Sequence, residues 1–470
     1  MLVAVPEIAC REVAVSQDGT PRTIAGHTDM PVHNMDLSST RPRASIMMPA
    51  GRMADLRAAL LLFVPFALMM LFTGMDFRLI GDETDFHVKI VEEFARTWPN
   101  LDLSNYRSAS TPLAYVLLTA FGKVVGLEIW KLRMLTALAT FGAAYLFYKL
   151  CARLELPHPL LSSLVFLFFP YIFFFGFTIY PENFGLLFGV WALSYYIPEE
   201  PSLKRLLKGS VLATLAIYCR QSYIVLPVGM LLYELRRLVQ HGSGASTRRS
   251  VQRLALLAVP LFMFLPMLFL WGGFTSPGNL ASQGGEWFLA LTPAHLNYFL
   301  MLVGFYFLPM LLATHARYAR KTWKGIFLPA AILMPVFIFF PVIFDEGKGP
   351  IAYAGGLIIH GLDVLRQTTS GVVASAAMLG LWMAGLIIAS GEWARWPWSR
   401  EKTKITTIGL TFAGLMTMTP FVYERYYILL IPLLLLLFHK SVRPTRLMAI
   451  WLGLQALLSA GFSYWQIALK

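Results

Sequence analysis

Four ionisable side chains lie close together in the segment GDETDFH, which runs from Gly81 to His87. Asp82, Glu83, Asp85 and His87 follow directly after the first long apolar stretch of the chain. A carboxylate at such a place can stay ionised and take a proton from an attacking hydroxyl group. Glu83 and His87 are four residues apart, so they would share one face of a helix. The alternative is a solvated helix start, in which Asp82 and Glu83 favour the positive end of the helix dipole.

Two later turns carry polar residues that membrane segments usually avoid. YPENF, residues 180–184, places Glu182 directly after a proline that suits a helix start. CRQSY, residues 219–223, holds Arg220 and Gln221 between two apolar runs. The planar guanidinium of Arg220 is suited to a phosphate group, whereas snorkelling to lipid headgroups explains the same residue equally well. Both turns are candidates for substrate contact.

A third polar turn, YERYY at residues 423–427, holds Glu424 beside Arg425. Its Tyr and Arg side chains would also fit an aromatic belt at a membrane interface. The segment from Trp271 to Gly285 is rich in Gly and Ser and contains no Lys or Arg. Such a composition predicts a mobile loop that could close over a substrate, or an ordinary surface loop.

The composition is that of an integral membrane protein. Of 470 residues, 57% are hydrophobic and 14% are charged, and the mean hydropathy is +0.61. Soluble domains carry about 25% charged residues. Apolar runs of about 20 residues recur after Leu56, and each is long enough to cross a hydrocarbon core of about 30 Å as a helix. We therefore expect an all-α fold, a polytopic bundle of transmembrane helices.

Basic residues set the expected orientation of the bundle. Arg52 and Arg57 flank the start of the first span, Leu56–Thr73, which puts the N-terminus in the cytoplasm and GDETDFH on the other side. The short run Thr111–Val125 is expected to lie on the outer surface, so the second span is Leu132–Leu150. Later clusters of Lys and Arg alternate with turns that hold few bases. This alternation predicts about thirteen spans with the C-terminus outside.

The chain divides into two parts by composition. Residues 1–50 are polar and are expected to form a disordered cytoplasmic tail. Residues 51–470 form one transmembrane domain, in which residues 76–131 are a non-cytoplasmic first loop with juxtamembrane helices. The net charge of +13 is spread between the apolar runs and follows from topology, so membrane lipids are expected partners and nucleic acid is not.

Several other classes of site have no signature in the sequence. Cys10, Cys151 and Cys219 are scattered, so they predict no disulfide framework, and the histidines show no metal-ligand spacing. There is no phosphate-binding Gly-rich loop and no HExxH motif. We expect no cofactor and no metal site, although two adjacent acids leave a divalent cation open.

Taken together, the motifs resemble the GT-C superfamily of polyprenyl-phosphate-sugar-dependent glycosyltransferases. The similar features are the acidic DE..FH-like signature after the first span, the helix containing Thr111, Pro112 and Tyr115, and Leu132-Arg133. The Arg220-Gln221-Ser222 step and the Glu424-Arg425-Tyr426 turn are similar to the branch of eukaryotic dolichyl-phosphate-glucose alpha-1,2-glucosyltransferases. The chain departs from that branch in one extra residue between its DE pair and FH, and in Thr275-Ser276-Pro277, which lacks the branch's outer-loop signature.

The resemblance implies an inverting transfer of a hexose, with glucose as the specific candidate. The donor would be a polyprenyl-phosphate sugar, and the acceptor a hydroxyl of a lipid-linked glycan or another molecule on the non-cytoplasmic face. The implied location is the bacterial inner membrane, or the endoplasmic reticulum membrane in a eukaryote. The implied roles are Glu83 or Asp82 as base, Asp85 or His87 as acceptor-orienting group, and Arg220 with Arg425 as binders of the leaving phosphate. The remaining substrate-binding candidates are Thr111, Glu182, Gln221, Glu424 and Tyr426.

Two other classes of protein remain open. A flippase or transporter of lipid-linked oligosaccharides would need polar residues along a path through the spans, with access that alternates between the two sides. A structural membrane subunit would use the outer loops only to bind a partner. An assay of sugar transfer separates both from the enzyme.

Overall fold

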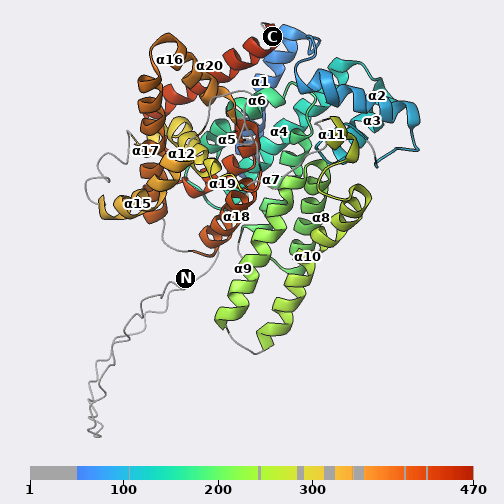
Figure 1. Cartoon of the computed structure of the whole chain (residues 1–470). Coiled ribbons are helices and arrows are strands. Elements are labelled where there is room, and N and C mark those ends of the chain that lie inside the picture. The colour runs from blue at the N-terminus through green and yellow to red at the C-terminus, as the bar shows by residue number, and fades with distance from the viewer. Residues whose placement is uncertain are drawn as a thin grey trace, which may run out of the picture. The chain divides into compact units, whose positions relative to one another are not determined.

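The structure is a computed structural model that describes residues 50–468, apart from residues 105, 199, 242–244, 283–290, 312–322, 341, 343–353, 396–398 and 420–421. Helices make up nearly all of this described part (Figure 1), so the predicted all-α fold is confirmed. The described strands are two residues long, β1 (Ala354–Gly355) and β2 (Val422–Tyr423), and they pair in parallel. The predicted tail, residues 1–50, lies outside the described residues except for Ala50, where the first helix begins.

Five described helices are long and apolar enough to cross a membrane. Their candidate spans are Met53–Thr73, Ile129–Arg153, Thr247–Trp271, Gly371–Trp393 and Arg446–Ile467. They belong to α1 (Ala50–Thr73), α4 (Ile129–Arg153), α10 (Ala245–Trp271), α17 (Gly371–Arg395) and α20 (Arg446–Ala468). The first two contain the predicted first and second spans. The total of about thirteen spans stays a prediction.

The segment after α1 folds into short helices instead of an open loop. The chain turns at Gly74, whose φ of +58° suits a glycine, and enters the π-helical turn η1 (Glu83–His87), followed by α2 (Val88–Thr97). The predicted surface run is α3 (Leu113–Val125), which begins after Pro112 and ends at Gly126. Ile90 and Phe94 are buried on an amphipathic α2 that packs against α3.

The middle of the chain is a set of helices packed side by side. They are α5 (Pro159–Leu167), α6 (Pro170–Phe175), α7 (Glu182–Tyr196), α8 (Leu203–Cys219), η2 (Gln221–Ile224) and α9 (Val225–His241). The chain breaks between α5 and α6 because a proline at residue 170 cannot continue the helix before it. α7 packs between α4 and α8, and α8 also packs against α10. These contacts fix the C-terminal end of α8 relative to the start of α7.

The C-terminal half packs a second group of helices. They are α11 (Pro277–Ser282), α12 (Ala294–Tyr306), α13 (Leu308–Met310), α15 (Trp323–Phe339), α16 (Leu357–Thr368), α18 (Arg400–Met416), η4 (Glu424–Tyr427) and α19 (Leu430–Leu437). α12 and α17 make close backbone contact, because a Cβ atom on Gly304 would lie 1.9 Å from the carbonyl oxygen of Leu381. Small residues allow this approach.

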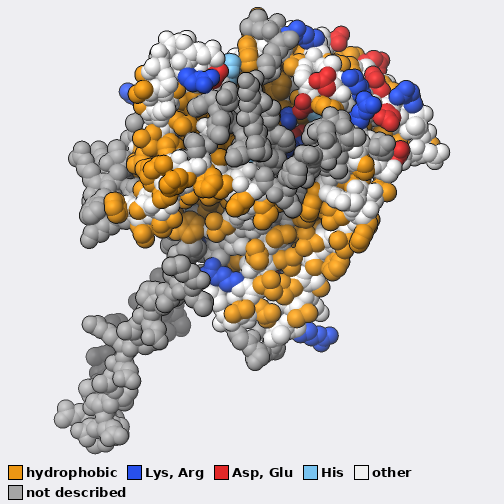
Figure 2. All heavy atoms as spheres, in the orientation of Figure 1, with side chains coloured by type: hydrophobic (Ala, Val, Ile, Leu, Met, Phe, Trp, Pro, Cys, Tyr) orange, Lys and Arg blue, Asp and Glu red, His pale blue; other side chains and the backbone are white. Residues whose placement is uncertain are grey.

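Charged side chains are not spread evenly over the part of the surface visible in Figure 2. Acidic and basic side chains gather near α2 and α3, whereas orange apolar side chains cover much of the flank formed by α8 and α10. Basic side chains without acidic neighbours appear at the far end of α10. This distribution agrees with the uneven placement of bases that the sequence shows.

Candidate active site

Four segments that are far apart in the sequence bring charged side chains to one place. Asp82 immediately precedes η1, and Glu182 is the first residue of α7, after Pro181. Arg220 caps the C-terminus of α8 in an extended conformation, with φ −154° and ψ 120°, which turns the chain away from the helix axis. Arg425 lies in η4, after the short strand β2. Each of these residues stands at the end of an element, where the backbone changes direction.

The four side chains form two ion pairs, which we call the acid–arginine cluster (Asp82, Glu182, Arg220 and Arg425). Asp82 Oδ2 lies 2.5 Å from Arg425 Nη1, and Glu182 Oε1 lies 2.8 Å from Arg220 Nη1. The ring of Tyr426 joins the pairs, since its centroid is 5.4 Å from Cζ of Arg220 and 5.6 Å from Cζ of Arg425. One aromatic ring thus lies within cation–π distance of both guanidinium groups.

Buried polar atoms at the cluster have no hydrogen-bond partner among the described residues. They are Glu182 Oε2, Arg425 Nε and Gln221 Oε1. Most buried polar atoms in proteins are paired, and an unpaired one costs about 1–3 kcal/mol. The atoms include one donor and two acceptors. A substrate with both phosphate oxygens and hydroxyl groups would satisfy all three.

The two candidate bases have different surroundings. Asp82 keeps 35% of its side chain exposed, whereas Glu83 is fully buried. Burial raises the pKa of Asp82, but the charge and hydrogen bond of Arg425 lower it further, so the net pKa lies below its usual range. Asp82 therefore stays ionised near neutral pH and can be reached from the surface.

Glu83 forms a closed ion pair with Arg133. Arg133 donates from Nε to Oε1 at 3.0 Å and from Nη2 to Oε2 at 2.7 Å, and Ile179 N–H donates to Oε1 at 2.9 Å. The same guanidinium donates to the carbonyl oxygens of Met75, Phe77 and Arg78. Both oxygens of Glu83 are engaged and neither is exposed, so between the two alternatives the geometry favours Asp82 as base. The sequence showed Arg133 within a motif but not as the partner of Glu83.

His87 lies beside the acid–arginine cluster in a buried polar chain. Its Nδ1 shares a hydrogen bond of 2.7 Å with the hydroxyl of Tyr115, which in turn lies 2.8 Å from Ser108 Oγ. Burial lowers the pKa of His87 to about 4, although the carboxylates of Glu182 and Asp82 act in the opposite direction. The imidazole is thus neutral near pH 7. The sequence analysis named Tyr115 only as part of a helix and did not predict its hydrogen bonds to His87 and Ser108.

Of the other predicted site residues, one lies beside Arg220, one holds two helices together and one is exposed. Gln221 belongs to the site, because its amide nitrogen donates to the carbonyl oxygens of Ala109 and Phe274 beside Arg220. Ser110, which the sequence did not single out, accepts a hydrogen bond of 3.0 Å from Arg220. Thr111 is fully buried, and its hydroxyl donates to the carbonyl of Ile217, so it fastens α3 to α8. Asp85 is exposed.

Glu424 is a buried anchor for the turn that carries Arg425. It accepts hydrogen bonds from the hydroxyls of Tyr298 and Tyr306 on α12 and from the N–H of Ile358 at the start of α16. Its exposure is 0%, and its three hydrogen bonds are to the protein itself, so the substrate contact expected from the sequence stays a prediction. Burial raises the pKa of Glu424 to about 7, even though the three donors lower it. Glu424 therefore positions η4.

The predicted mobile loop is held in place over its described part. Trp271 Nε1 donates to the carbonyl of Leu103 at 2.8 Å, and Ser276 Oγ donates to the carbonyl of Ser108 at 3.1 Å. Residues 277–282 form the helix α11. These contacts fasten the described part of the segment to the residues before α3, and closure of the segment over a substrate stays a prediction. Residues 283–285 lie outside the described residues.

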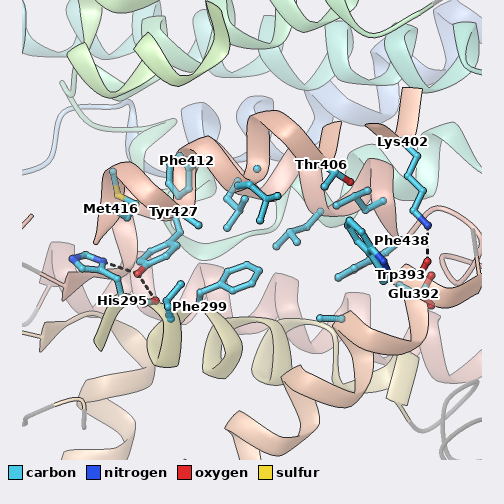
Figure 3. Close-up of a pocket in the computed structure, with 18 residues that line it drawn as sticks. His295, Phe299, Glu392, Trp393, Lys402, Thr406, Phe412, Met416, Tyr427 and Phe438 are labelled. Atoms are coloured by element: carbon cyan, nitrogen blue, oxygen red, sulfur yellow. Dashed lines mark hydrogen bonds between the residues drawn. The ribbon is translucent and has the colours of Figure 1, made fainter. Parts of the chain in front are cut away.

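A narrow apolar cavity of about 180 Å³ lies between α12, α17, α18 and α19 (Figure 3). At one end His295 Nδ1 shares a hydrogen bond of 2.8 Å with the hydroxyl of Tyr427, the residue after Tyr426. At the other end lie Lys402, Trp393 and Glu392, and the wall between is lined by apolar side chains such as Phe412 and Phe438. Among the described residues, no group of three or more His, Cys, Asp or Glu is arranged to hold a metal ion.

No protein-family model and no curated protein sequence matches this chain. Among solved structures, it is similar to ArnT from Cupriavidus metallidurans in the apo state, with 16% identity, a TM-score of 0.42, and coverage of 88% of this chain and 78% of that one. It is also similar to an oligosaccharyltransferase from Archaeoglobus fulgidus tethered to an acceptor peptide, with 14% identity, a TM-score of 0.40, and coverage of 89% and 55%. Likeness at these values establishes neither a family nor a function.

Proposed function

We propose that this chain is an integral-membrane inverting glycosyltransferase. It would move a hexose, with glucose as the specific candidate, from a polyprenyl-phosphate carrier to a hydroxyl of a lipid-linked glycan or another acceptor on the non-cytoplasmic face. The observation that carries the proposal is the acid–arginine cluster, in which two carboxylates and two guanidinium groups from four distant segments meet around Tyr426. This set contains one candidate base and two phosphate binders.

Asp82 is assigned as the general base. The acceptor oxygen attacks C1 of the sugar while the bond between C1 and the phosphate oxygen breaks, which inverts the configuration at C1. The proton of the attacking hydroxyl passes to Asp82, and the lipid phosphate leaves with the bonding electrons. Asp82 suits this role because it is partly exposed and ionised, whereas both oxygens of Glu83 are already bound.

Arg220 and Arg425 are assigned to the leaving phosphate. Guanidinium groups bind phosphate through paired, charge-assisted hydrogen bonds, and the unpaired Nε of Arg425 is available for one of them. A phosphate that binds Arg425 competes with Asp82 for the same group. Donor binding would thus release Asp82 from its counter-ion and make it a stronger base.

The carrier's hydrocarbon tail is assigned to the apolar cavity of Figure 3. One end of the cavity is at Tyr427, next in sequence to the ring that touches both arginines. The lining residues on α18 run from Lys402 to Met416, which corresponds to about 21 Å along a helix. A slot of this length suits a single extended chain, whose burial contributes about 0.8 kcal/mol for each CH₂ group.

The test is transfer from synthetic polyprenyl-phosphate sugars, one sugar at a time, by the purified full-length chain in lipid nanodiscs. The wild type should transfer a hexose with inversion, and Asp82→Asn should not. If the wild type transfers from no polyprenyl-phosphate sugar but carries lipid-linked oligosaccharide between the two leaflets of a vesicle, the protein is a flippase. If it does neither, the site is not catalytic.

A further inference from the structure

A second charged hollow lies at the other end of α8 from the acid–arginine cluster. Leu203, the first residue of α8, and Arg248, Arg249 and Gln252 on α10 line a cavity of about 530 Å³. α8 has 17 residues, so this hollow is about 25 Å from the helix end that Arg220 caps. It is therefore separate from the proposed phosphate site.

The two arginines of this hollow have no acidic partner in the described part of the chain. Both are exposed, and neither forms an ion pair with any residue that the structure describes. The acids nearest in the sequence have other partners, because Glu234 binds Arg253 and Glu200 lies 2.9 Å from Arg237. Lys204 adds an exposed positive charge beside Leu203. The hollow is thus strongly positive and attracts an anion.

An apolar strip leads away from the hollow along α8. Leu207 and Val211 follow Leu203 at intervals of four residues, so the three lie on one helix face. Leu207 and Val211 are about half exposed, and Val251 on the neighbouring α10 is exposed as well. A free phosphate ion makes no favourable contact with an apolar strip, whereas the acyl chains of a lipid would bury it.

We propose that Arg248, Arg249, Gln252 and Leu203 form a binding site for the headgroup of an anionic phospholipid. The guanidinium groups would bind the lipid phosphate, Gln252 would donate a further hydrogen bond, and the acyl chains would lie along Leu207 and Val211. The site lies at the opposite end of α8 from the acid–arginine cluster, so it does not depend on the proposed transferase activity.

The test is native mass spectrometry of the full chain in neutral detergent, with phosphatidylglycerol or phosphatidylcholine added. The wild type should bind phosphatidylglycerol more tightly. Arg248→Gln with Arg249→Gln should weaken this binding roughly 30-fold, because each base near a membrane surface contributes about 1 kcal/mol. The matched control is Arg443→Gln with Arg446→Gln, which removes the same charge from two exposed arginines outside the hollow and should leave binding unchanged.

Several outcomes would overturn the proposal. They are unchanged binding in the Arg248/Arg249 variant, equal weakening in the control, equal binding of phosphatidylcholine by the wild type, and displacement of the lipid by millimolar inorganic phosphate. The last would identify a free phosphate as the ligand. A further variant, Arg248→Lys with Arg249→Lys, keeps the charge and should retain most of the binding. A loss as large as in the glutamine variant would contradict an electrostatic site.

Discussion

Asp82 and Arg425 are 343 residues apart in the chain and form an ion pair of 2.5 Å. The pair joins the proposed base to a proposed phosphate binder, so the charge of each group affects the pKa of the other. Both side chains keep about a third of their surface exposed, which lets a ligand enter between them. A partly exposed ion pair adds little stability, so its value lies in the site rather than in the fold.

Replacing the base should stop the reaction without unfolding the protein. We expect Asp82→Asn to lower kcat for sugar transfer by about 10²–10⁴-fold, the usual contribution of a general base. The unfolding temperature should barely change. Glu92→Gln on the exposed face of α2 is the matched control and should keep full activity. Steady-state kinetics in nanodiscs checks both, and full activity in Asp82→Asn would exclude this residue as base.

The ring of Tyr426 should matter for donor binding through its face and not through its hydroxyl. It lies within 5.4 and 5.6 Å of the two guanidinium groups, and each cation–π contact contributes about 0.5–2 kcal/mol. We expect Tyr426→Leu to raise the KM for the donor by about tenfold or more, and Tyr426→Phe to have little effect. Equal KM values for Leu and Phe variants would show that the ring does not hold the arginines.

The buried ion pair of Glu83 and Arg133 should stabilise the folded protein. Removing one member of a buried ion pair costs about 3–5 kcal/mol, because the other charge is left buried alone. We therefore expect Glu83→Gln and Arg133→Met each to lower the unfolding temperature markedly, with activity per folded molecule retained by Glu83→Gln. A Glu83→Gln protein that unfolds normally but transfers no sugar would instead make Glu83 the base.

The sequence predicted the type of fold and the convergence of its charged turns, but not how the charges pair. Hydropathy identifies the helices, and the alternation of bases predicts that the turns carrying Asp82, Glu182, Arg220 and Arg425 lie on one side of the membrane. Which of the two adjacent acids is exposed depends on the rotation of a single π-helical turn. A sequence pattern does not fix that rotation, so Asp82 and Glu83 could not be separated in advance.

Two of the predicted substrate contacts are polar residues at turns that the structure shows in other interactions. Thr111 and Glu424 are polar and lie at turns, yet both are fully buried and fasten elements to each other. Their partners, Ile217, Tyr298 and Tyr306, lie more than a hundred residues away in the chain. Long-range pairing of this kind leaves no local signal, so only the folded structure distinguishes an anchor from a ligand contact.

The contact between α12 and α17 should not tolerate a side chain. A Cβ atom on Gly304 would lie 1.9 Å from the carbonyl oxygen of Leu381, and neither backbone can move without shifting a helix. We expect Gly304→Ala to destabilise the protein by about 1–3 kcal/mol or more. Gly380→Ala in α17 is the control, because its Cβ would meet nothing within 4 Å. Thermal unfolding measures both, and equal unfolding temperatures would contradict the close contact.

Glu424 should make stability depend on pH. Its pKa is about 7 in the folded protein and near 4.5 when unfolded, so the folded state binds more protons between these values. The resulting stabilisation is fully present below pH 4.5 and is lost as the pH rises through 7, at up to about 1.4 kcal/mol for each pH unit. Glu424→Gln replaces the carboxyl group with an amide that does not titrate, so it should flatten this fall in stability.

The comparison must be made between variants, because His87 contributes in the opposite direction. Its pKa is about 4 in the folded protein and 6.5 when unfolded, so its effect favours the folded state as the pH rises from 4 to 6.5. The difference in unfolding temperature between wild type and Glu424→Gln cancels the His87 contribution, which both share. We expect this difference to change in favour of the variant between pH 5 and pH 7.5. A difference that stays constant over this range would mean that Glu424 is already ionised in the folded protein at pH 5, and that the tyrosine hydroxyls compensate fully for its burial.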